Sequence, residues 1–449
     1  MAEQWQATTL GALGEFRNGV NFNRRQEGPG LPVVKVKDFG SKVFAPASGL
    51  DELSIPLAEL PQDQLLKDGD IIIIRSNGSS ALVGRSVVFQ DAGRPTTFSG
   101  FCIRFRPDKN RIDPAFAAYY LRSPFVRQRF SAFGSGTGIQ NLSQSILAEL
   151  PLKLPAMAEQ RGIAELLRAL DDKIELNRRM NEKLEAIARA VFKSWFVDFD
   201  PVHAKGERRY ATGSKSFADL FPTGFQNSER GLAPKGWNFK TVGEVTDRVG
   251  MGPFGASIKV ETFVSEGIPI ISGQHLRRFV LDDNTFNFIR DEHAERLANA
   301  IVRRGDVIFT HAGNIGQVAL IPSNSRYDRY ILSQRQFFMR CNLSQITPTF
   351  AVLYFSSAEG QHALLANTSS SGVPSIARPV TYLRSIRLLV PPKEVLDAFQ
   401  SIVEPLLRKL RQNDDENEAL ASVRDFLLPK VMSGAIRIND AEKIVEVQV

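Results

Sequence analysis

Short apolar runs dominate two stretches of the chain, residues 1–155 and about 232–391. The runs are rich in β-branched and aromatic residues and include VVKVKDF, DIIIIRS, SVVFQ and FCIRFRP, then DVIFTH, QVALIP and QFFMRC. Because Gly, Pro, Asn and Ser separate them, they predict short strands. One helix is predicted in each stretch, at 114–130 and 348–365, since both segments open with proline, which suits a first helical turn. We expect two mixed α/β globules.

After Pro155 and Pro391 the apolar residues take up a helical spacing. Steps of seven connect Ile163, Leu170, Asn177, Leu184 and Val191 in the first segment, and Phe399, Leu406, Asn413, Leu420 and Leu427 in the second. Further apolar residues, Ile187 among them, lie between these positions. A sustained stripe of this period predicts a long helix that packs against a partner helix. At ~1.5 Å per residue the first helix would be about 60 Å long.

Each stripe has one polar member at the matching place, Asn177 and Asn413. A buried Asn on a helix–helix seam fixes register and partner choice at some cost in stability. Two interpretations stay open at this point. Either the two helices pack against each other with both asparagines in the seam, or both asparagines face solvent beside their charged neighbours.

The chain also repeats itself. Segments 31–34, 69–74, 114–117 and 138–139 match 268–271, 305–309, 348–351 and 372–373 in the same order, and Pro155 matches Pro391. The separation stays at roughly 235 residues throughout, which chance would rarely produce. The unit that repeats is a globule followed by a long helix.

This repeat predicts the fold class and the domain organisation. The fold is α/β, with two mixed α+β globules in tandem, each followed by a long helix. The two helices are expected to form an antiparallel coiled-coil spacer with pseudo-twofold symmetry. The expected boundaries are 1–155 and 232–391 for the globules, 156–202 and 392–436 for the helical spacers, 203–231 for a linker, and 437–449 for a C-terminal tail.

Composition narrows the classes of function. The net charge of +7 suits a nucleic-acid partner without proving one. Two cysteines, Cys102 and Cys341, are too few for a disulfide framework and show no zinc spacing, so we expect no bound metal. No apolar stretch is long enough to span a bilayer, and the first residues lack the layout of a signal peptide. A cytoplasmic protein is therefore expected.

Loops between the predicted strands carry side chains that suit DNA. Arg pairs with guanine edges, Asn and Gln pair with adenine edges, and Ser and Thr reach phosphates. The candidates in the first globule are Lys35, Lys37, Arg75, Ser76, Asn77, Arg85, Thr137, Gln140 and Asn141. Those in the second are Gln274, His275, Arg277, Arg278, His311, Asn314, Gln334, Arg335, Ser369 and Ser370. For each candidate there is also a simpler interpretation: the residue is a solvated surface residue or, in the case of the histidines, a residue packed in the protein.

The motifs of common DNA-modifying chemistry are missing from the sequence. GSSALVGRS lacks the Gly-Lys-Ser/Thr ending of a nucleotide-binding loop, and no G-x-G-x-x-G follows a predicted strand. The Asp/Asn-Pro-Pro-Tyr/Phe tetrapeptide of amino-methyltransferases does not occur, nor does a convincing acidic cluster of nuclease type. No catalytic residue is predicted, and chemistry is expected to come from a partner.

Several segments together resemble the DNA-specificity subunit of type I restriction-modification systems. They are LPVVKVKDF, GTGIQNLSQSILAELPLKLP, LEAIARAVFKSWFVDFDPV, SGVPSIARPVTYLRSIRLLVPP and FLLPKVMSGAIRI. The resemblance covers nearly the whole chain and includes its two-copy plan. It implies that each globule is a target recognition domain for one part of a bipartite, asymmetric DNA site, and that the helices set the gap between the two parts.

The resemblance also implies the partners and their cofactors. It implies two adenine methyltransferase subunits that use S-adenosylmethionine and dock on the helices. It further implies two restriction/translocase subunits that use ATP and Mg²⁺. This chain itself would bind double-stranded DNA and no cofactor. Two alternatives are a stand-alone DNA-modifying enzyme and a protein scaffold without DNA specificity of its own.

An aromatic cluster ends the first long helix. Trp195, Phe196 and Phe199 are candidates for docking a partner, because exposed aromatic residues are enriched in the cores of protein interfaces. Packing onto the adjacent globule is the simpler interpretation, and it is favoured for the neighbouring Phe192.

Overall fold

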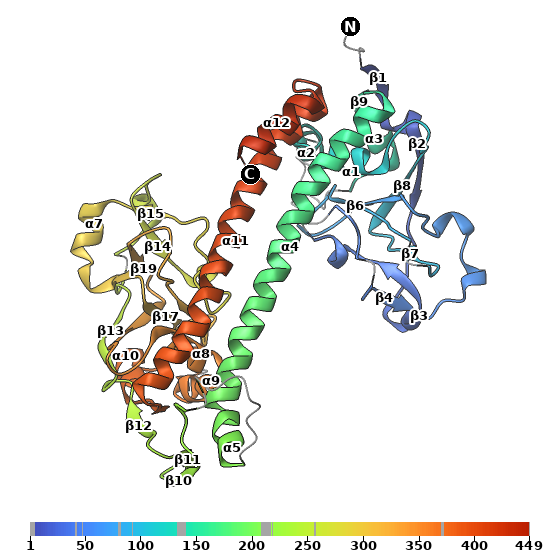
Figure 1. The fold of residues 1–449 in the computed structure, drawn as a ribbon. Helices are drawn as coiled ribbons and strands as arrows, with labels where there is room; N and C mark the ends of the chain where they lie inside the picture. Colours follow the sequence, from blue (N-terminus) through green and yellow to red (C-terminus); the bar gives the residue numbers. More distant parts are fainter. Residues whose placement is uncertain are drawn as a thin grey trace. The chain divides into compact units, whose positions relative to one another are not determined.

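The computed structural model describes residues 5–40, 43–46, 48–79, 82–91, 93–132, 141–207, 217, 219–255, 257–369 and 372–448. The chain divides into two compact units. Unit 1 is Met1–Asn177 with Asp415–Val449, and unit 2 is Arg178–Asp414. Each unit contains one globule and one part of each long helix, α4 (Met157–Phe196) and α11 (Lys393–Ser433) (Figure 1). The unit therefore combines a globule with segments distant in the sequence.

Unit 1 is built on two small sheets. An antiparallel sheet has the strand order β2 (Gly14–Asn18), β8 (Cys102–Pro107), β5 (Ile71–Ile74), β6 (Ser86–Val88). A second sheet has the order β4 (Asp51–Leu53), β3 (Glu27–Val34), β7 (Thr97–Phe98), in which β3 and β7 run parallel. All four isoleucines of β5 are buried, as expected for a strand covered on both faces.

The remaining elements of unit 1 surround these sheets. The strand β1 (Gln6–Thr9) pairs with β9 (Pro151–Leu154) just before α4 begins. Helices α1 (Pro114–Arg122), α2 (Pro124–Ala132) and α3 (Gln144–Ala148) complete the globule. The C-terminal segment forms a further helix, α12 (Ile438–Gln448), which packs its apolar side chains into the unit 1 core.

Unit 2 repeats this plan. One sheet has the order β13 (Thr246–Met251), β20 (Gln336–Cys341), β17 (Asp306–Thr310), β18 (Val318–Leu320). The other has the order β15 (Phe288–Ile289), β14 (Ile268–Ile271), β19 (Arg329–Leu332), β16 (Ile301–Arg303), with β14 and β19 parallel. The strand β12 (Asn238–Thr241) pairs with β23 (Arg387–Val390), and β21 (Thr368–Ser369) pairs with β22 (Ser375–Ile376).

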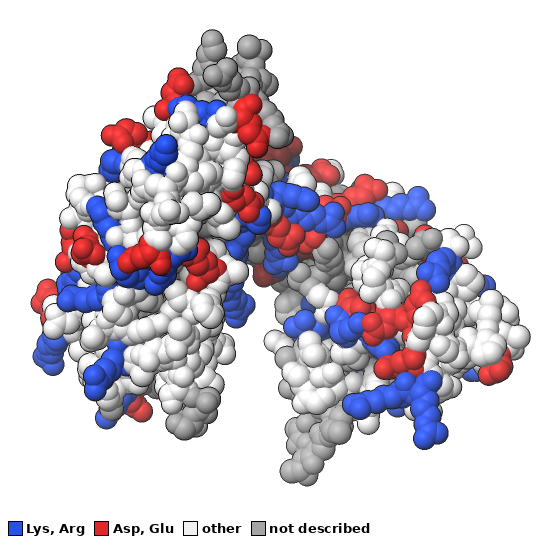
Figure 2. Space-filling view, turned by 90° about the horizontal axis from the view of Figure 1, so that it is seen from below, with Lys and Arg blue, Asp and Glu red and all other residues white. Residues whose placement is uncertain are grey.

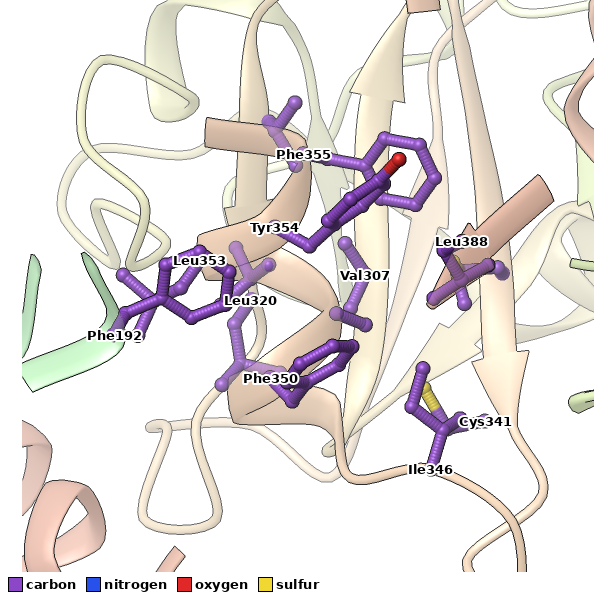
Figure 3. Packing of buried hydrophobic residues seen from close by; sticks show 14 of the residues in the cluster. Phe192, Val307, Leu320, Cys341, Ile346, Phe350, Leu353, Tyr354, Phe355 and Leu388 are labelled. Carbon is purple, nitrogen blue, oxygen red and sulfur yellow. The ribbon is translucent and has the colours of Figure 1, made fainter. Parts of the chain in front are cut away.

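The helices of unit 2 are α5 (Asp200–Gly206), α7 (Asp291–Arg296), α8 (Pro348–Ser356), α9 (Ala358–Leu365) and α10 (Pro379–Ser385). The largest apolar cluster lies between α8, the sheet and the two long helices. Figure 3 shows Phe192 of α4 reaching into this cluster beside Leu353 and Phe350, and the Phe192 and Phe350 ring centroids lie 5.6 Å apart.

Matching details of the two units confirm the sequence repeat. Gly69 and Gly305 precede the central strands with φ of 84° and 86°, a conformation that favours glycine. The next residues are the buried carboxylates Asp70 and Asp306, and each accepts two hydrogen bonds from one arginine. The Nε–Oδ1 and Nη2–Oδ2 distances are 2.8 and 2.7 Å in both the Arg106–Asp70 pair and the Arg340–Asp306 pair.

The long helices pack antiparallel within each unit. In unit 1, Asn177 donates to Glu416 Oε2 at 2.9 Å, whereas Asp171, earlier in α4, accepts from Arg424, later in α11, at 2.7 Å. In unit 2, Asn413 donates to Asn181 Oδ1 at 2.8 Å. Phe192, later in α4, contacts Phe399, earlier in α11. Both asparagines of the heptad stripes are buried, at 1% and 0% exposure, and so lie in the helix–helix packing and not on the solvent face.

The other positions of the stripes are less uniform. Ile163, Leu170, Phe399, Leu420 and Leu427 are buried, while Leu184, Val191 and Leu406 are half-buried and pack at the edge of the unit 2 core. Ile187 is 48% exposed, and Ala188 takes the buried position beside it. Each long helix packs against a globule as well as against the other long helix. Its buried face is therefore wider than the seam of a two-helix coiled coil, and the centre of that face does not coincide with the seven-residue stripe.

Several expected boundaries differ from the structure. Each helix expected at 114–130 and 348–365 is two helices, separated at Ser123 and at Ser357. Pro124 lacks the backbone N–H that a continuous helix needs, and the Ser357 hydroxyl caps the new helix by accepting from Gly360 N at 3.2 Å. The expected linker, 203–231, contains the end of α5 and the strand β10 (Phe225–Ser228), which pairs with β11 (Gly231–Pro234).

Candidate nucleic-acid interface

Three backbone segments of unit 1 meet where the central strand β5 ends. Arg75 N donates to Phe101 O at 2.9 Å, and Leu142 N donates to Arg75 O at 2.9 Å. Ser76 forms an antiparallel bridge with Asn141. The candidates Arg75, Ser76 and Asn141, distant in the sequence, are therefore held side by side at one edge of the sheet.

Unit 2 has the same arrangement at the end of β17. His311 N donates to Arg335 O at 2.9 Å, Ile376 N donates to His311 O at 2.8 Å, and Ala312 bridges to Ser375. His311 thus occupies the place of Arg75, and Arg335 occupies the place of Phe101. The shared backbone frame therefore presents different side chains in the two units.

The other candidates of the first globule do not all lie beside Arg75, Ser76 and Asn141. The strand β3 ends at Val34, and Val36–Asp38 is a 3₁₀ turn, so the expected strand face carrying Lys35 and Lys37 is not formed. Lys35 pairs with Glu27 at 2.8 Å and Asp51 at 3.1 Å, and Lys37 also pairs with Asp51. The ammonium groups of Lys37 and Lys35 lower the pKa of the Asp51 carboxyl.

Two further candidates lie on loops close to the end of β5. Asn77 Oδ1 accepts from Ser79 N at 2.8 Å and so shapes its own loop. Arg85 is exposed and precedes β6. Thr137 and Gln140, from the first globule, and Ser370, from the second, lie outside the described residues.

Two second-globule candidates are structural. His275 is 2% exposed and stacks on Phe286, with ring centroids 4.4 Å apart, and burial lowers its pKa. Arg278 donates to Asp414 Oδ2 at 2.6 Å and lies 3.8 Å from Glu185, so it ties the globule to both long helices within unit 2. Neither side chain is available to DNA as expected from the sequence. Their neighbours Gln274 and Arg277 are exposed.

The remaining candidates of unit 2 gather around His311. Burial lowers the pKa of His311, whose Nε2 lies 3.1 Å from Gln334 O. Asn314, Gln334, Arg335 and Ser369 are exposed. A cavity of about 500 Å³ opens beside His311 and is also lined by Met251, Phe254, Ser375, Arg378 and Thr381.

Sequence reasoning missed two exposed aromatic residues at this edge. Phe101 is 61% exposed and lies directly against Arg75 through the backbone hydrogen bond. Phe254 is 77% exposed and lines the cavity beside His311. Both stand next to glycine, in SGF and PFG, and this pairing of Gly with an aromatic residue was the available signal, although Phe101 also begins the predicted strand run FCIRFRP.

The aromatic cluster at the end of α4 packs inward. Phe196 is 8% exposed and contacts the rings of Phe350 and Phe399 at 4.8 and 4.9 Å. Trp195 contacts Phe221 at 5.0 Å, and Phe199 contacts Trp237 at 5.7 Å. The structure therefore favours core packing over partner docking for Trp195, Phe196 and Phe199.

Charge, membrane and metal features add three observations. Figure 2 shows basic and acidic side chains intermixed over the face that it draws, without one extended field of a single sign. Among the described residues, no helix combines the length and apolar character needed to cross a membrane. The same residues contain no cluster of three His, Cys, Asp or Glu side chains suited to a metal ion.

Comparison with known proteins bears on this two-unit frame. A family model described as the type I restriction modification DNA specificity domain matches residues 2–186. The MjaIX specificity subunit of Methanocaldococcus jannaschii is 24% identical over 355 residues, which cover 77% of this chain and 74% of that protein. The HindI specificity subunit of Haemophilus influenzae is 25% identical over 380 residues, which cover 74% and 79%. Over most of its length the chain is therefore similar to type I restriction-modification specificity subunits.

A solved structure supports the same fold for this chain. The crystal structure of the type I restriction-modification S subunit from M. genitalium matches with a TM-score of 0.56 at 18% identity, and the match covers 95% of this chain and 96% of that chain. The two curated relatives are named specificity subunits of type I restriction enzymes, and the matching family model describes a DNA specificity domain. The mixed α/β fold with two packed long helices is confirmed.

Proposed function

We propose that the chain recognises a bipartite, asymmetric DNA site, with unit 1 reading one part and unit 2 the other. The observation that carries the proposal is the repeated frame at the ends of β5 and β17, which presents Arg75 and Phe101 in one unit and His311 and Arg335 in the other. One scaffold with two sets of side chains supports two half-sites of different sequence.

We propose further that partner subunits perform the chemistry. Two adenine methyltransferase subunits, using S-adenosylmethionine, would dock on the long helices, and two ATP- and Mg²⁺-dependent restriction/translocase subunits would complete the assembly. The family resemblance supports this division of labour. A methyltransferase acting on duplex DNA must take its target base out of the stack, and the specificity subunit would hold the flanking duplex in place.

Mapping of N6-methyladenine in the host genome tests the proposal. Cells that express the chain with its methyltransferase subunit are compared with cells that express the methyltransferase subunit alone. We expect methylation only with the chain present, in a motif of two defined blocks separated by a constant unspecified gap. A single continuous motif, or methylation without any motif, would contradict the proposal.

The helices are proposed to set that gap. A deletion of four residues in the middle of α4 or α11 is close to one helical turn, so it shortens the helix by about 6 Å while nearly keeping the buried face in place. The expected result is a changed gap with the same two blocks. Altered bases in either block, with the gap unchanged, would contradict the role of the helices as a ruler.

A further inference from the structure

Two loops meet beside the candidate interface in each unit. In unit 1 the loop after β2 contacts the loop after β7, since Gly100 N donates to Val20 O at 2.7 Å. In unit 2 the corresponding loops follow β13 and β19, and the Gln334 side-chain amide donates to Gly255 O. Residues on the paired loops are therefore neighbours in space.

Backbone hydrogen bonds match the positions of these loops one to one. Gly19 N donates to Cys102 O at 3.2 Å, and Gly252 N donates to Gln336 O at 2.8 Å. A serine carbonyl oxygen leaves no room for a side chain at either glycine. A Cβ would lie 2.2 Å from Ser99 O at Gly19 and 1.9 Å from Ser333 O at Gly252. Gly19 therefore corresponds to Gly252, and Cys102 corresponds to Gln336.

The matched positions carry exchanged chemistry. Counted from these anchors, Phe101 corresponds to Arg335, and Asn21 corresponds to Phe254. All four side chains are exposed, Phe101 at 61% and Phe254 at 77%. Each unit thus presents one phenylalanine and one polar side chain on the paired loops, and the two residue types have changed places between the units.

The chemistry of each pair fits the edges of two bases in the major groove. An apolar side chain contacts the C5 methyl group of thymine, asparagine pairs with adenine, and arginine pairs with guanine. Phe101 and Phe254 lie on loops that do not correspond between the two units, and both rings are too exposed to gain stability from the protein core. Contact with a base methyl group would remove their apolar surface from water. The backbone contact of Phe101 with Arg75 and the shared cavity of Phe254 and His311 place both rings at the candidate interface.

We propose that the paired loops form a two-residue base reader in each unit, Asn21 with Phe101 for adenine and thymine, and Phe254 with Arg335 for thymine and guanine. This inference rests on the proposed function, because it assigns specificity-determining residues to the two half-sites. It predicts that one position of each half-site is chosen by a phenylalanine and another by the polar partner.

Methylation mapping with exchanged residues tests the reader. The chain carrying Phe101→Arg is expressed with its methyltransferase subunit, and the methylated motif is compared with that of the unaltered chain. We expect thymine preference at one position of one block to fall by about 10-fold or more, with a gain of guanine, while the other block stays the same. Arg335→Phe should act in the opposite sense on the other block alone, and Phe101→Leu should keep the thymine.

Matched controls separate this effect from a surface change. Phe125, 51% exposed on α2, is replaced by arginine, and Arg296, exposed at the end of α7, is replaced by phenylalanine. Neither control should alter the motif. An unchanged motif in Phe101→Arg would overturn the reader and leave the proposed function standing. Equal loss of methylation on all sequences would also overturn it, because the ring would then support the loop and not choose a base. If the unaltered chain directs no motif, the proposed function itself fails.

Discussion

Replacement of Arg278 by alanine separates a structural role from DNA reading. The Arg278 guanidinium donates to Asp414 Oδ2 at 2.6 Å and lies 3.8 Å from Glu185 Oε1. The carboxylate side chains are 14% and 15% exposed, so the mutation leaves two mostly buried negative charges close together in unit 2. The adjacent Arg277 is exposed and serves as the matched control.

The cost of the mutation follows from the burial of the pair. A charge-assisted hydrogen bond contributes about 1.5–3 kcal/mol, and removal of one partner from a fully buried ion pair costs about 3–5 kcal/mol. Because the Arg278 side chain keeps 27% of its exposure, solvent screens part of the interaction. We expect Arg278→Ala to lower the free energy of unfolding by about 2 kcal/mol, and Arg277→Ala by less than about 0.5 kcal/mol.

The effect should depend on pH in a defined direction. Burial already raises the pKa of Glu185, against the lowering influence of Arg278. A carboxyl whose pKa is higher in the folded state than in the unfolded state penalises the folded state above that pKa, and protonation relieves the penalty. Loss of Arg278 raises the Glu185 pKa further. The stability deficit of Arg278→Ala should therefore shrink as the pH falls through the raised pKa of Glu185.

Urea unfolding followed by tryptophan fluorescence measures the deficit. Trp195 and Trp237 lie in unit 2, and Trp5 is the third tryptophan, so the signal reports mainly on the unit that contains Arg278. Methylation mapping of the same variants completes the test. Unchanged unfolding midpoints together with an altered motif in Arg278→Ala would refute the reasoning.

Two further predictions concern the helix packing of unit 2. Asn181→Leu and Asn413→Leu each leave a buried polar partner unsatisfied, so each should lower the free energy of unfolding by about 1–3 kcal/mol. The double variant should lose less than the sum of the two single variants, because neither polar partner then remains. Additive losses in urea unfolding would contradict this coupling. Phe196→Ala should lower the free energy of unfolding by about 3–5 kcal/mol, because the buried ring fills the core between α4, α8 and α11. The control Val197→Ala, at a position that is 41% exposed, should lower it by less than about 0.5 kcal/mol. Thermal or urea unfolding measures both. A similar loss in both variants would show that Phe196 is not a core residue.

Much of the candidate site depends on pairings that no local pattern contains. Arg75 and Asn141 appear in the sequence as separate loop residues, and only the hydrogen bonds to Arg75 place them at one edge of the sheet. Tertiary contacts also take two other candidates out of the exposed set. His275 is drawn into the core by stacking on Phe286, and Arg278 is drawn to Asp414, although each resembles an exposed base-reading residue in the sequence.

The sequence by itself determined the two-copy plan, the long helices and the strands, because each depends on local periodicity and on a repeated order of segments. It also marked Asn177 and Asn413 as exceptions in the stripes, and their burial follows from the side of the helix on which they stand. Only the tertiary structure decided which loop residues meet, which arginine supports the fold, and that Trp195 packs inward. These outcomes depend on contacts between segments far apart in the chain, whose energies compete in ways that residue type and spacing do not specify.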